Sequence, residues 1–264
     1  MLTSPEVDSR HYVFALPLHS PEDIPRDFGY RRQDDFLAGV FLPRDDPDWF
    51  GRSGYPARLL LLFEGHVAIV PHPKSPKAAP TYLGLEDVEA VESGQALLVG
   101  WIRLHSRQTA DVPYNRRTSA PVERWLQALR HRLCPKPDVP PRACHMVGDP
   151  LDIKFTNALA AESEAGEQAA TVWFKAPVAR SVGTWIFSRR TTGPGHLIAA
   201  MSDRLLWLTD RMGRGRERYG YVATYAPLRH IENFSIEPDM ATVTLKSGIR
   251  WEVRRSGEPP QGRP

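Results

Sequence analysis

Residues 196–234 read HLIAAMSDRLLWLTDRMGRGRERYGYVATYAPLRHIENF, and a second copy of their pattern occurs earlier in the chain. The earlier copy, residues 58–91, reads RLLLLFEGHVAIVPHPKSPKAAPTYLGLEDVEAV. In both copies two short apolar runs flank a two-residue turn, a polar loop follows, and three apolar residues spaced three apart complete the pattern. Such internal repetition is typical of a repeated structural unit. At an offset of 138 residues, and five more after the loop, the matching positions are Glu64-Gly65 with Ser202-Asp203, Val67–Val70 with Leu205–Leu208, and Leu85, Val88 and Val91 with Leu228, Ile231 and Phe234.

The composition is that of an ordinary globular protein. Of 264 residues, 41% are hydrophobic and 25% are charged, which argues against wholesale disorder, and a net charge of +3 does not favour nucleic-acid binding. Two cysteines do not make a disulfide framework. The N-terminus does not resemble a secretory signal, and the longest apolar runs, such as residues 59–63, have the length of a strand. We therefore expect a cytoplasmic protein without a transmembrane segment.

Short apolar runs between turn residues predict a mainly β protein with a few helices. The clearest helix is expected at residues 119–133, where Ser119 can cap it and Pro121 lies in its first turn. A second, short helix is expected at residues 151–163. The apolar face of the first helix consists of Val122, Trp125, Leu126, Leu129 and Leu133.

The same patterns predict the strands and the domain boundaries. Turns are expected at Ser93-Gly94, at residues 188–195 and at Ser247-Gly248. Strands are expected at 11–18, 36–42, 58–63, 66–70, 82–91, 95–104, 171–174, 182–187, 219–225, 240–246 and 249–253, with a hairpin at 197–209. The predicted organisation is a first domain at 1–134 with an irregular N-terminal segment, a proline-rich linker at 135–149, a second domain at 150–256 and a tail at 257–264.

Four segments of this chain resemble the bacterial pleckstrin-homology-like (PH-like) families, which are related in architecture to PH and GRAM domains. They are HLIAAMSDRLLWLTD (196–210), YAPLRHIENFSI (225–236), ATVTLKSGIRWEV (241–253) and VPYNRRTSAPVERWLQALR (112–130). The resemblance covers roughly residues 56–134 and 150–255, and implies two tandem antiparallel split barrels, the first closed by a C-terminal helix. Members of these families bind lipid headgroups, dock proteins or serve structural roles, and the resemblance carries over no active site.

The best candidate binding segment is residues 211–218, RMGRGRER, between two expected strands. Its glycines can turn backbone N–H groups toward an anion, and guanidinium groups bind phosphate in a bidentate manner. A solvated hairpin loop is the alternative, and we favour it over an anion site. The candidate ligand residues are Arg211, Arg214, Arg216 and Arg218.

Two groups of residues raise the question of a metal site. Three close acids can bind a divalent cation, but Asp and Pro also favour ordinary turns, which is the interpretation that we prefer. The Cys and His residues near the linker do not have the usual zinc-ligand spacing. The acids are Asp45, Asp46 and Asp48, and the possible zinc ligands are His131, Cys134, Cys144 and His145. No metal or other cofactor is expected.

Aromatic side chains near the arginine segment can stack on nucleic-acid bases, but alternation places some of them in the core, so nucleic-acid binding is disfavoured. Histidines on expected strands are more often packed residues than catalytic bases. No nucleophile, metalloprotease or phosphate-loop motif is present. The aromatic residues are Trp207, Tyr219, Tyr221 and Tyr225, and the histidines are His66, His105, His196 and His230.

These observations favour a non-enzymatic binding or scaffold protein whose two PH-like domains mediate protein–protein interaction or self-association. The first alternative is peripheral binding of anionic lipid or phosphate through the arginine segment, which would place the protein at the inner face of the membrane. An enzyme with a site between the domains is the weakest of the three hypotheses.

Overall fold

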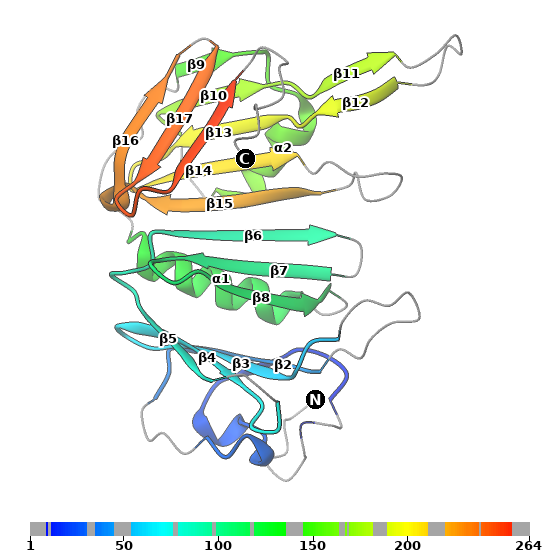
Figure 1. Cartoon of the computed structure of the whole chain (residues 1–264), viewed down its shortest axis with the longest axis vertical. Helices are drawn as coiled ribbons and strands as arrows, with labels where there is room; N and C mark the ends of the chain where they lie inside the picture. Colours follow the sequence, from blue (N-terminus) through cyan, green and yellow to red (C-terminus); the bar gives the residue numbers. More distant parts are fainter. Residues whose placement is uncertain are drawn as a thin grey trace, which may run out of the picture. The chain divides into compact units, whose positions relative to one another are not determined.

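The chain forms two compact units. The computed structural model describes residues 9, 12–30, 35–44, 54–75, 79–96, 99–116, 119–135, 145–163, 167, 169–181, 189–210, 220–237 and 239–254. Unit 1 comprises Met1–Val88 and Leu97–Pro135, and unit 2 comprises Glu89–Ala96 and Lys136–Pro264. The described residues contain eighteen strands and two α-helices (Figure 1), which confirms the predicted mainly β class with a few helices. None of the sheets that these residues form closes into a barrel.

Unit 1 holds a five-stranded antiparallel sheet, a hairpin and one α-helix. In β3, residues 59–62 are fully buried because both faces of the sheet are covered. Leu59 and Leu61 pack in one cluster with Phe28 of the N-terminal segment, whereas α1 packs on the opposite face against β1, β2 and β3. The elements are β1 (Leu16–Leu18), η2 (Pro21–Asp23), η3 (Arg26–Phe28), β2 (Ala38–Leu42), β3 (Arg58–Leu62), β4 (His66–Pro71) and β5 (Thr81–Gly84), then the hairpin β7 (Val99–His105) and β8 (Ala110–Asn115), and α1 (Ala120–Leu133).

Unit 2 contains strands in the order β6-β15-β14-β13-β10-β9 and a separate sheet in the order β16-β17-β18. Only β9 joins its neighbour in the parallel sense; the other pairs of these two sheets are antiparallel. The elements are β6 (Ala90–Ala96), β9 (His145–Gly148), α2 (Ile153–Glu162), β10 (Thr171–Lys175), the paired β11 (Val178–Ser181) and β12 (Arg189–Gly193), β13 (His196–Ala200), β14 (Arg204–Asp210), β15 (Tyr221–Pro227), η6 (Leu228–His230), β16 (Ile231–Ile236), β17 (Met240–Leu245) and β18 (Arg250–Arg254).

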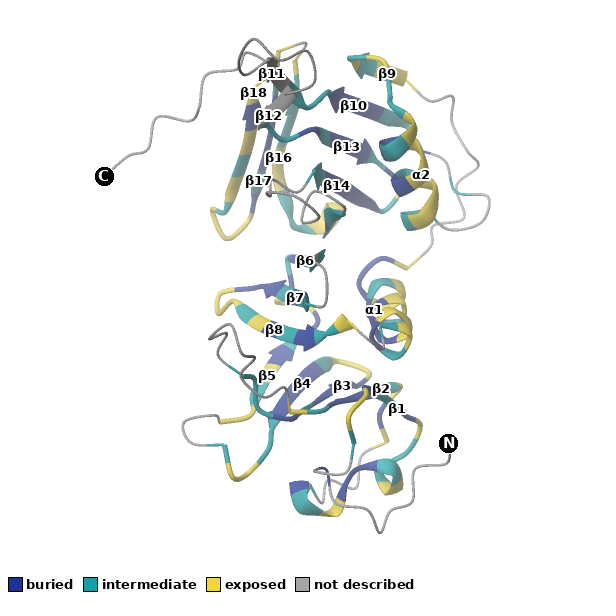
Figure 2. Cartoon of the chain, turned by 90° about the vertical axis from the view of Figure 1, so that its right-hand side faces the viewer, coloured by how far each residue is buried: buried dark blue, intermediate teal, exposed yellow. Residues whose placement is uncertain are grey.

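The long sheet of unit 2 lies between α2 and the three-stranded sheet (Figure 2). Successive residues of a strand point to opposite faces, so alternate positions enter two separate cores. On β10, Val172 and Phe174 pack with Phe155 of α2, whereas Trp173 packs with Val243 of β17. This alternation decides which functional side chains of unit 2 share a face.

The hairpins β3–β4 and β13–β14 have the same register at the 138-residue offset of the repeat. The equivalent pairs are Arg58–Pro71 and His196–Thr209, Leu59–Val70 and Leu197–Leu208, and Leu62–Val67 and Ala200–Leu205. The chain reversals after the turns match as well, in the bonds from Leu85 N–H to the Gly65 carbonyl and from Leu228 N–H to the Asp203 carbonyl, both 2.9 Å. The expected hairpins at 58–70 and 197–209 are therefore confirmed.

Two predicted turns are wrong. Ser93 and Gly94 lie inside β6, opposite Ala223 and Val222 of β15, because the ladder with a distant strand overrides the local turn signal. Similarly, residues 189–193 form β12, which pairs with β11. The expected strand at 82–91 is in fact interrupted by a turn at residues 85–87, and the expected strand at 182–187 lies outside the described residues.

The two helices begin differently from one another. Ser119 does not cap α1 with its side chain, contrary to expectation, because its backbone is itself helical with φ −74° and ψ −26°. Asp152 precedes α2 in an extended conformation and accepts a 2.8 Å hydrogen bond from the Phe155 N–H. This cap fixes the start of the helix that carries the first residue of the polar cluster described below.

Candidate functional site

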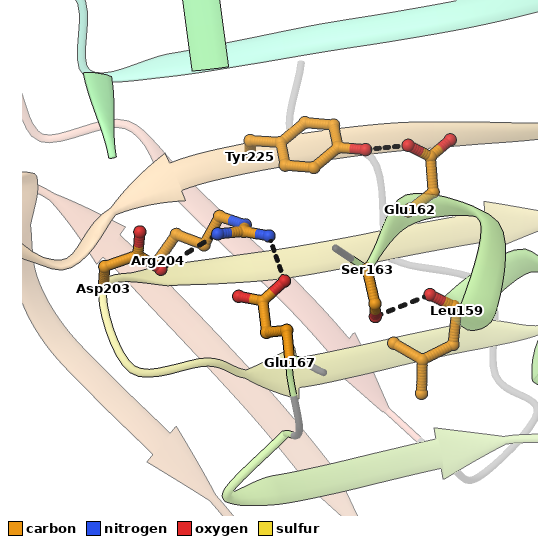
Figure 3. A network of polar contacts seen from close by, with 7 residues as sticks. All are labelled: Leu159, Glu162, Ser163, Glu167, Asp203, Arg204 and Tyr225. Carbon is orange, nitrogen blue, oxygen red and sulfur yellow. Dashed lines mark hydrogen bonds and ion pairs between the residues drawn. The ribbon is translucent and has the colours of Figure 1, made fainter. Parts of the chain in front are cut away.

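Helix α2 brings Glu162, its last residue, to two tyrosines of the sheet. Glu162 accepts a hydrogen bond from the hydroxyl of Tyr221 at 3.0 Å. It accepts another from the hydroxyl of Tyr225 (Figure 3). The tyrosines are four residues apart on β15, so they point to the same face, the one that α2 covers. These two bonds anchor the end of α2 on the sheet.

A buried group of three charged residues lies on the same strands (Figure 3). Arg204 donates from Nη2 to Glu167 Oε2 at 2.6 Å and from Nη1 to Asp203 Oδ1 at 3.0 Å. The exposed fractions of these side chains are 5% for Arg204, 14% for Glu167 and 8% for Asp203. Within the described residues, Arg204 Nε and Asp203 Oδ2 are buried without a hydrogen-bond partner. Two carboxylates thus face one guanidinium group.

Burial first, and the second carboxylate after it, disfavour the ionised form of Asp203. Burial raises the pKa of Asp203 above its ordinary value, Glu167 acts in the same direction, and Arg204 opposes them. The three side chains tie the turn before β14 to the segment that follows α2. Because they are almost excluded from solvent, we assign them a structural role.

His196, one of the predicted strand histidines, has a defined tautomer. Its Nδ1 accepts a hydrogen bond from Trp207 Nε1–H at 3.3 Å, and an indole nitrogen can only donate. Thr209 Oγ1 lies 3.2 Å from the same Nδ1 and must therefore donate its proton as well. The single ring proton of neutral His196 is consequently on Nε2. Burial lowers the pKa of His196 to about 4, and Lys175 acts in the same direction.

Ser9, Asp27 and His72 meet in unit 1, a combination of residue types found in hydrolases. Asp27 Oδ2 accepts from the Ser9 hydroxyl at 2.5 Å and from His72 Nε2 at 2.9 Å. His72 Nδ1 accepts from the Lys74 N–H at 3.2 Å, so its proton is on Nε2. The carboxylate stands between the serine and the histidine, and His72 is therefore not placed to take a proton from Ser9.

Most of the predicted ligand residues fall outside the described part of the chain. The two strands on either side of the arginine segment are paired, and their last pair is Asp210 with Tyr221. His131 and the buried Cys134 lie at the end of α1, and His145 begins β9. Among the described residues, no three His, Cys, Asp or Glu residues are grouped so as to hold a metal ion. The residues outside are Arg211, Arg214, Arg216 and Arg218, and also Asp45, Asp46, Asp48 and Cys144.

The aromatic residues proposed for base stacking do not share a surface where the structure describes them. Trp207 is buried on the face toward β16–β18, whereas Tyr225 is buried on the face toward α2. Tyr221 is held by Glu162, and Tyr219 lies outside the described residues. Trp207 and Tyr225 are therefore core residues.

Sequence reasoning missed Glu162, Glu167 and Arg204 as a group. A charged residue at the head of an apolar run, as Arg204 is in SDRLLWL, signals that a buried charge needs a partner. Its partner Glu167 is 37 residues away and follows a helix, so no spacing rule pairs the two. Lys175, at the end of TVWFK, carries the same signal.

None of the helices in the described part of the chain is long and apolar enough to cross a membrane. Comparison of the chain with protein-family models, with curated proteins and with solved structures found no match.

Proposed function

We propose that this chain is a non-enzymatic binding protein of two PH-like domains, residues 1–134 and 150–256, that self-associates through the open edge of strand β9, which lies just before the second domain and within unit 2. The equal registers of β3–β4 and β13–β14 support the tandem arrangement. In the first copy two runs of antiparallel strands are followed by α1, as the resemblance implies. The first copy departs from a self-contained PH-like domain in one respect. Its strand β6 belongs to unit 2, where it pairs with β15.

The observation that carries the self-association is the free edge of β9. The N–H groups of His145 and Asp149 donate to carbonyls of the β10 side, at 3.0 and 2.9 Å. Because the direction of these groups alternates along a strand, the N–H and C=O of Met146 point away from β10. No strand of the described residues pairs with β9 on that side.

The edge of β9 is also unprotected by its side chains. Proteins commonly shield sheet edges with charges, and β18 does so, with Glu252 bonded to Arg250 and Arg254 at 2.8 and 2.7 Å. β9 reads His-Met-Val-Gly, and its Met146 is 47% exposed. Ile153, at the start of α2, is 80% exposed. The edge therefore offers both main-chain and apolar contacts.

A second copy of the chain fits such an edge. Two antiparallel β9 strands would exchange hydrogen bonds between the two Met146 residues, and a two-fold interface needs only this one surface. Because β9 has only four residues, the exposed Met146 and Ile153 side chains would have to supply much of the contact.

Sedimentation velocity over a concentration series tests this proposal. We expect the wild type to form dimers, and Met146→Pro and Met146→Lys to stay monomeric. Proline at 146 removes an outward N–H without breaking a bond to β10. Leu37→Lys is the matched control, since Leu37 is an apolar residue of unit 1 with 49% exposure. A wild type that stays monomeric, or a Met146→Lys variant that still dimerises, would overturn the proposal.

A further inference from the structure

Lys175 is a buried cation at the end of β10. The residue is only 9% exposed, and it lies on the face of Trp173, toward β16–β18. Within the described residues its ammonium group makes no hydrogen bond and no ion pair. Burial lowers the pKa of Lys175, and the charge of Asp149 only partly opposes this effect. The ammonium nitrogen itself is not among the fully buried atoms of the described residues that lack a partner, so Lys175 can meet an anion that enters from solvent.

His196 supplies a second free donor at the same place. It lies directly opposite Lys175 in the β10–β13 ladder, where facing Cβ atoms are about 5 Å apart. Its Nδ1 is occupied by Trp207 and Thr209, so its only ring proton is on Nε2. The described residues give Nε2 no acceptor. Two adjacent groups therefore present N–H donors and no lone pair.

We propose that Lys175 Nζ and His196 Nε2 together bind one small oxyanion, a carboxylate or a phosphate, at this end of the unit 2 sheet. An anion there would satisfy both donors and balance the positive charge of Lys175. The site opens to solvent, because His196 and Thr209 are half-buried rather than closed off. The proposal does not rest on the pairing of β9 edges.

The two nearby carboxylates, Asp149 and Asp210, have other bonding partners than Lys175. Asp149 accepts the Ala176 N–H at 2.9 Å, and Asp210 pairs with Lys154 of α2. Asp210 also points to the α2 face, opposite Thr209. Within the described residues neither carboxylate forms an ion pair with Lys175, although Asp149 lies near enough to attract it electrostatically.

The wall beside the two donors is apolar. Trp207 and Trp251 pack edge to face with ring centroids 6.0 Å apart, and His196 lies 6.2 Å from Trp207. A charge interaction is stronger beside such low-dielectric walls than in water. One amine and one imidazole N–H suit a single oxyanion group.

Titration calorimetry of the full chain with inorganic phosphate and, separately, with acetate tests the site, with sodium chloride as the ionic-strength control. We expect saturable one-to-one binding of at least one of the two anions. Lys175→Met should weaken it at least tenfold, and Lys175→Arg should retain most of it. The matched control is Lys246→Met, since Lys246 is an exposed lysine of unit 2.

The variant should fold, because methionine keeps an unbranched apolar chain in the mostly buried place of the lysine stem and removes a charge that makes no ion pair within the described residues. An unchanged thermal midpoint of Lys175→Met without ligand will confirm this. Which anion binds identifies the ligand as phosphate-like or carboxylate-like. The proposal is overturned if neither anion binds saturably up to roughly 10 mM, or if Lys175→Met binds as the wild type does.

Discussion

Arg204 donates a 2.6 Å hydrogen bond to Glu167, and both side chains are almost excluded from solvent. Removing one partner of such a pair leaves the other charge buried. We therefore expect Arg204→Met to lower the free energy of unfolding by about 3–5 kcal/mol, as measured by urea denaturation. The loss should be larger at neutral than at acidic pH, because acid neutralises the two carboxylates left behind.

Two further variants test whether the loss of stability comes from the buried position of Arg204 rather than from removal of any arginine. Arg103→Met breaks an ion pair with Asp111 whose side chains are 40% and 57% exposed, and should cost less than about 1 kcal/mol. Adding Asp203→Asn and Glu167→Gln to Arg204→Met should restore part of the stability. Equal losses for the two arginine variants would contradict a buried cluster.

His196 makes the stability depend on pH in one direction. Its pKa is about 4 in the folded protein, against an ordinary value of 6.5, because the ring is buried near Lys175. As the pH falls, the unfolded chain therefore takes up the proton first, and stability decreases from about pH 6.5 to about pH 4. At 1.36 kcal/mol per pKa unit, the contribution is at most about 3 kcal/mol.

His196→Gln keeps a polar side chain but does not titrate in this range. Urea denaturation of the wild type and variant between pH 7.5 and pH 3.5 gives two curves, whose difference should change between about pH 6.5 and 4 and be constant outside that window. A difference that does not vary with pH would show that the pKa of His196 is the same in the folded and the unfolded protein.

The hairpins could be predicted from the sequence because their information is local. Glu64-Gly65 and Ser202-Asp203 are turn pairs between apolar runs, and the register follows from the turn. The place of β6 could not be predicted, because Ser93 and Gly94 become strand residues only through β15, about 130 residues further along. β9 is a four-residue run near prolines, and it becomes a strand only because β10 pairs with it.

The site residues likewise fall into those placed by local sequence and those placed by contacts with distant segments. The predicted His196 lies beside Thr209 at the offset of the repeat, so a local pattern places both. The partners of Arg204 could not be found, since Glu167 comes from a segment beyond α2 with no periodic pattern. The free donors of Lys175 and His196 follow from tertiary packing, because only the position of Trp207 fixes the histidine tautomer.

Gly148 should not tolerate a side chain. Its φ is +100°, and a Cβ there would lie 2.3 Å from the Phe174 carbonyl oxygen. Gly29 also has positive φ, 58°, but a Cβ there would meet nothing within 4 Å. Gly29→Ala should therefore cost only the strain of about 1 kcal/mol, and Gly148→Ala clearly more, by urea denaturation. Faster amide exchange at Asp149 in Gly148→Ala would locate the damage, and equal losses at the two glycines would argue against it.

The arginine segment should decide whether the protein also binds anionic membranes. If the segment binds anionic lipid, the wild type floats with anionic but not neutral vesicles, more at low than at physiological salt, because exposed charge contacts are screened. In that case, changing Arg214, Arg216 and Arg218 to Glu abolishes flotation.

The control for this experiment must carry the same net charge. Changing Arg107, Arg124 and Arg229 to Glu reverses three exposed arginines elsewhere in the chain. If the interaction is local, this control variant floats as the wild type does; if net charge alone attracts the protein, both variants lose flotation equally. A wild type that stays in the soluble fraction at every salt concentration would exclude the lipid alternative and leave the free oxyanion at Lys175 as the ligand to pursue.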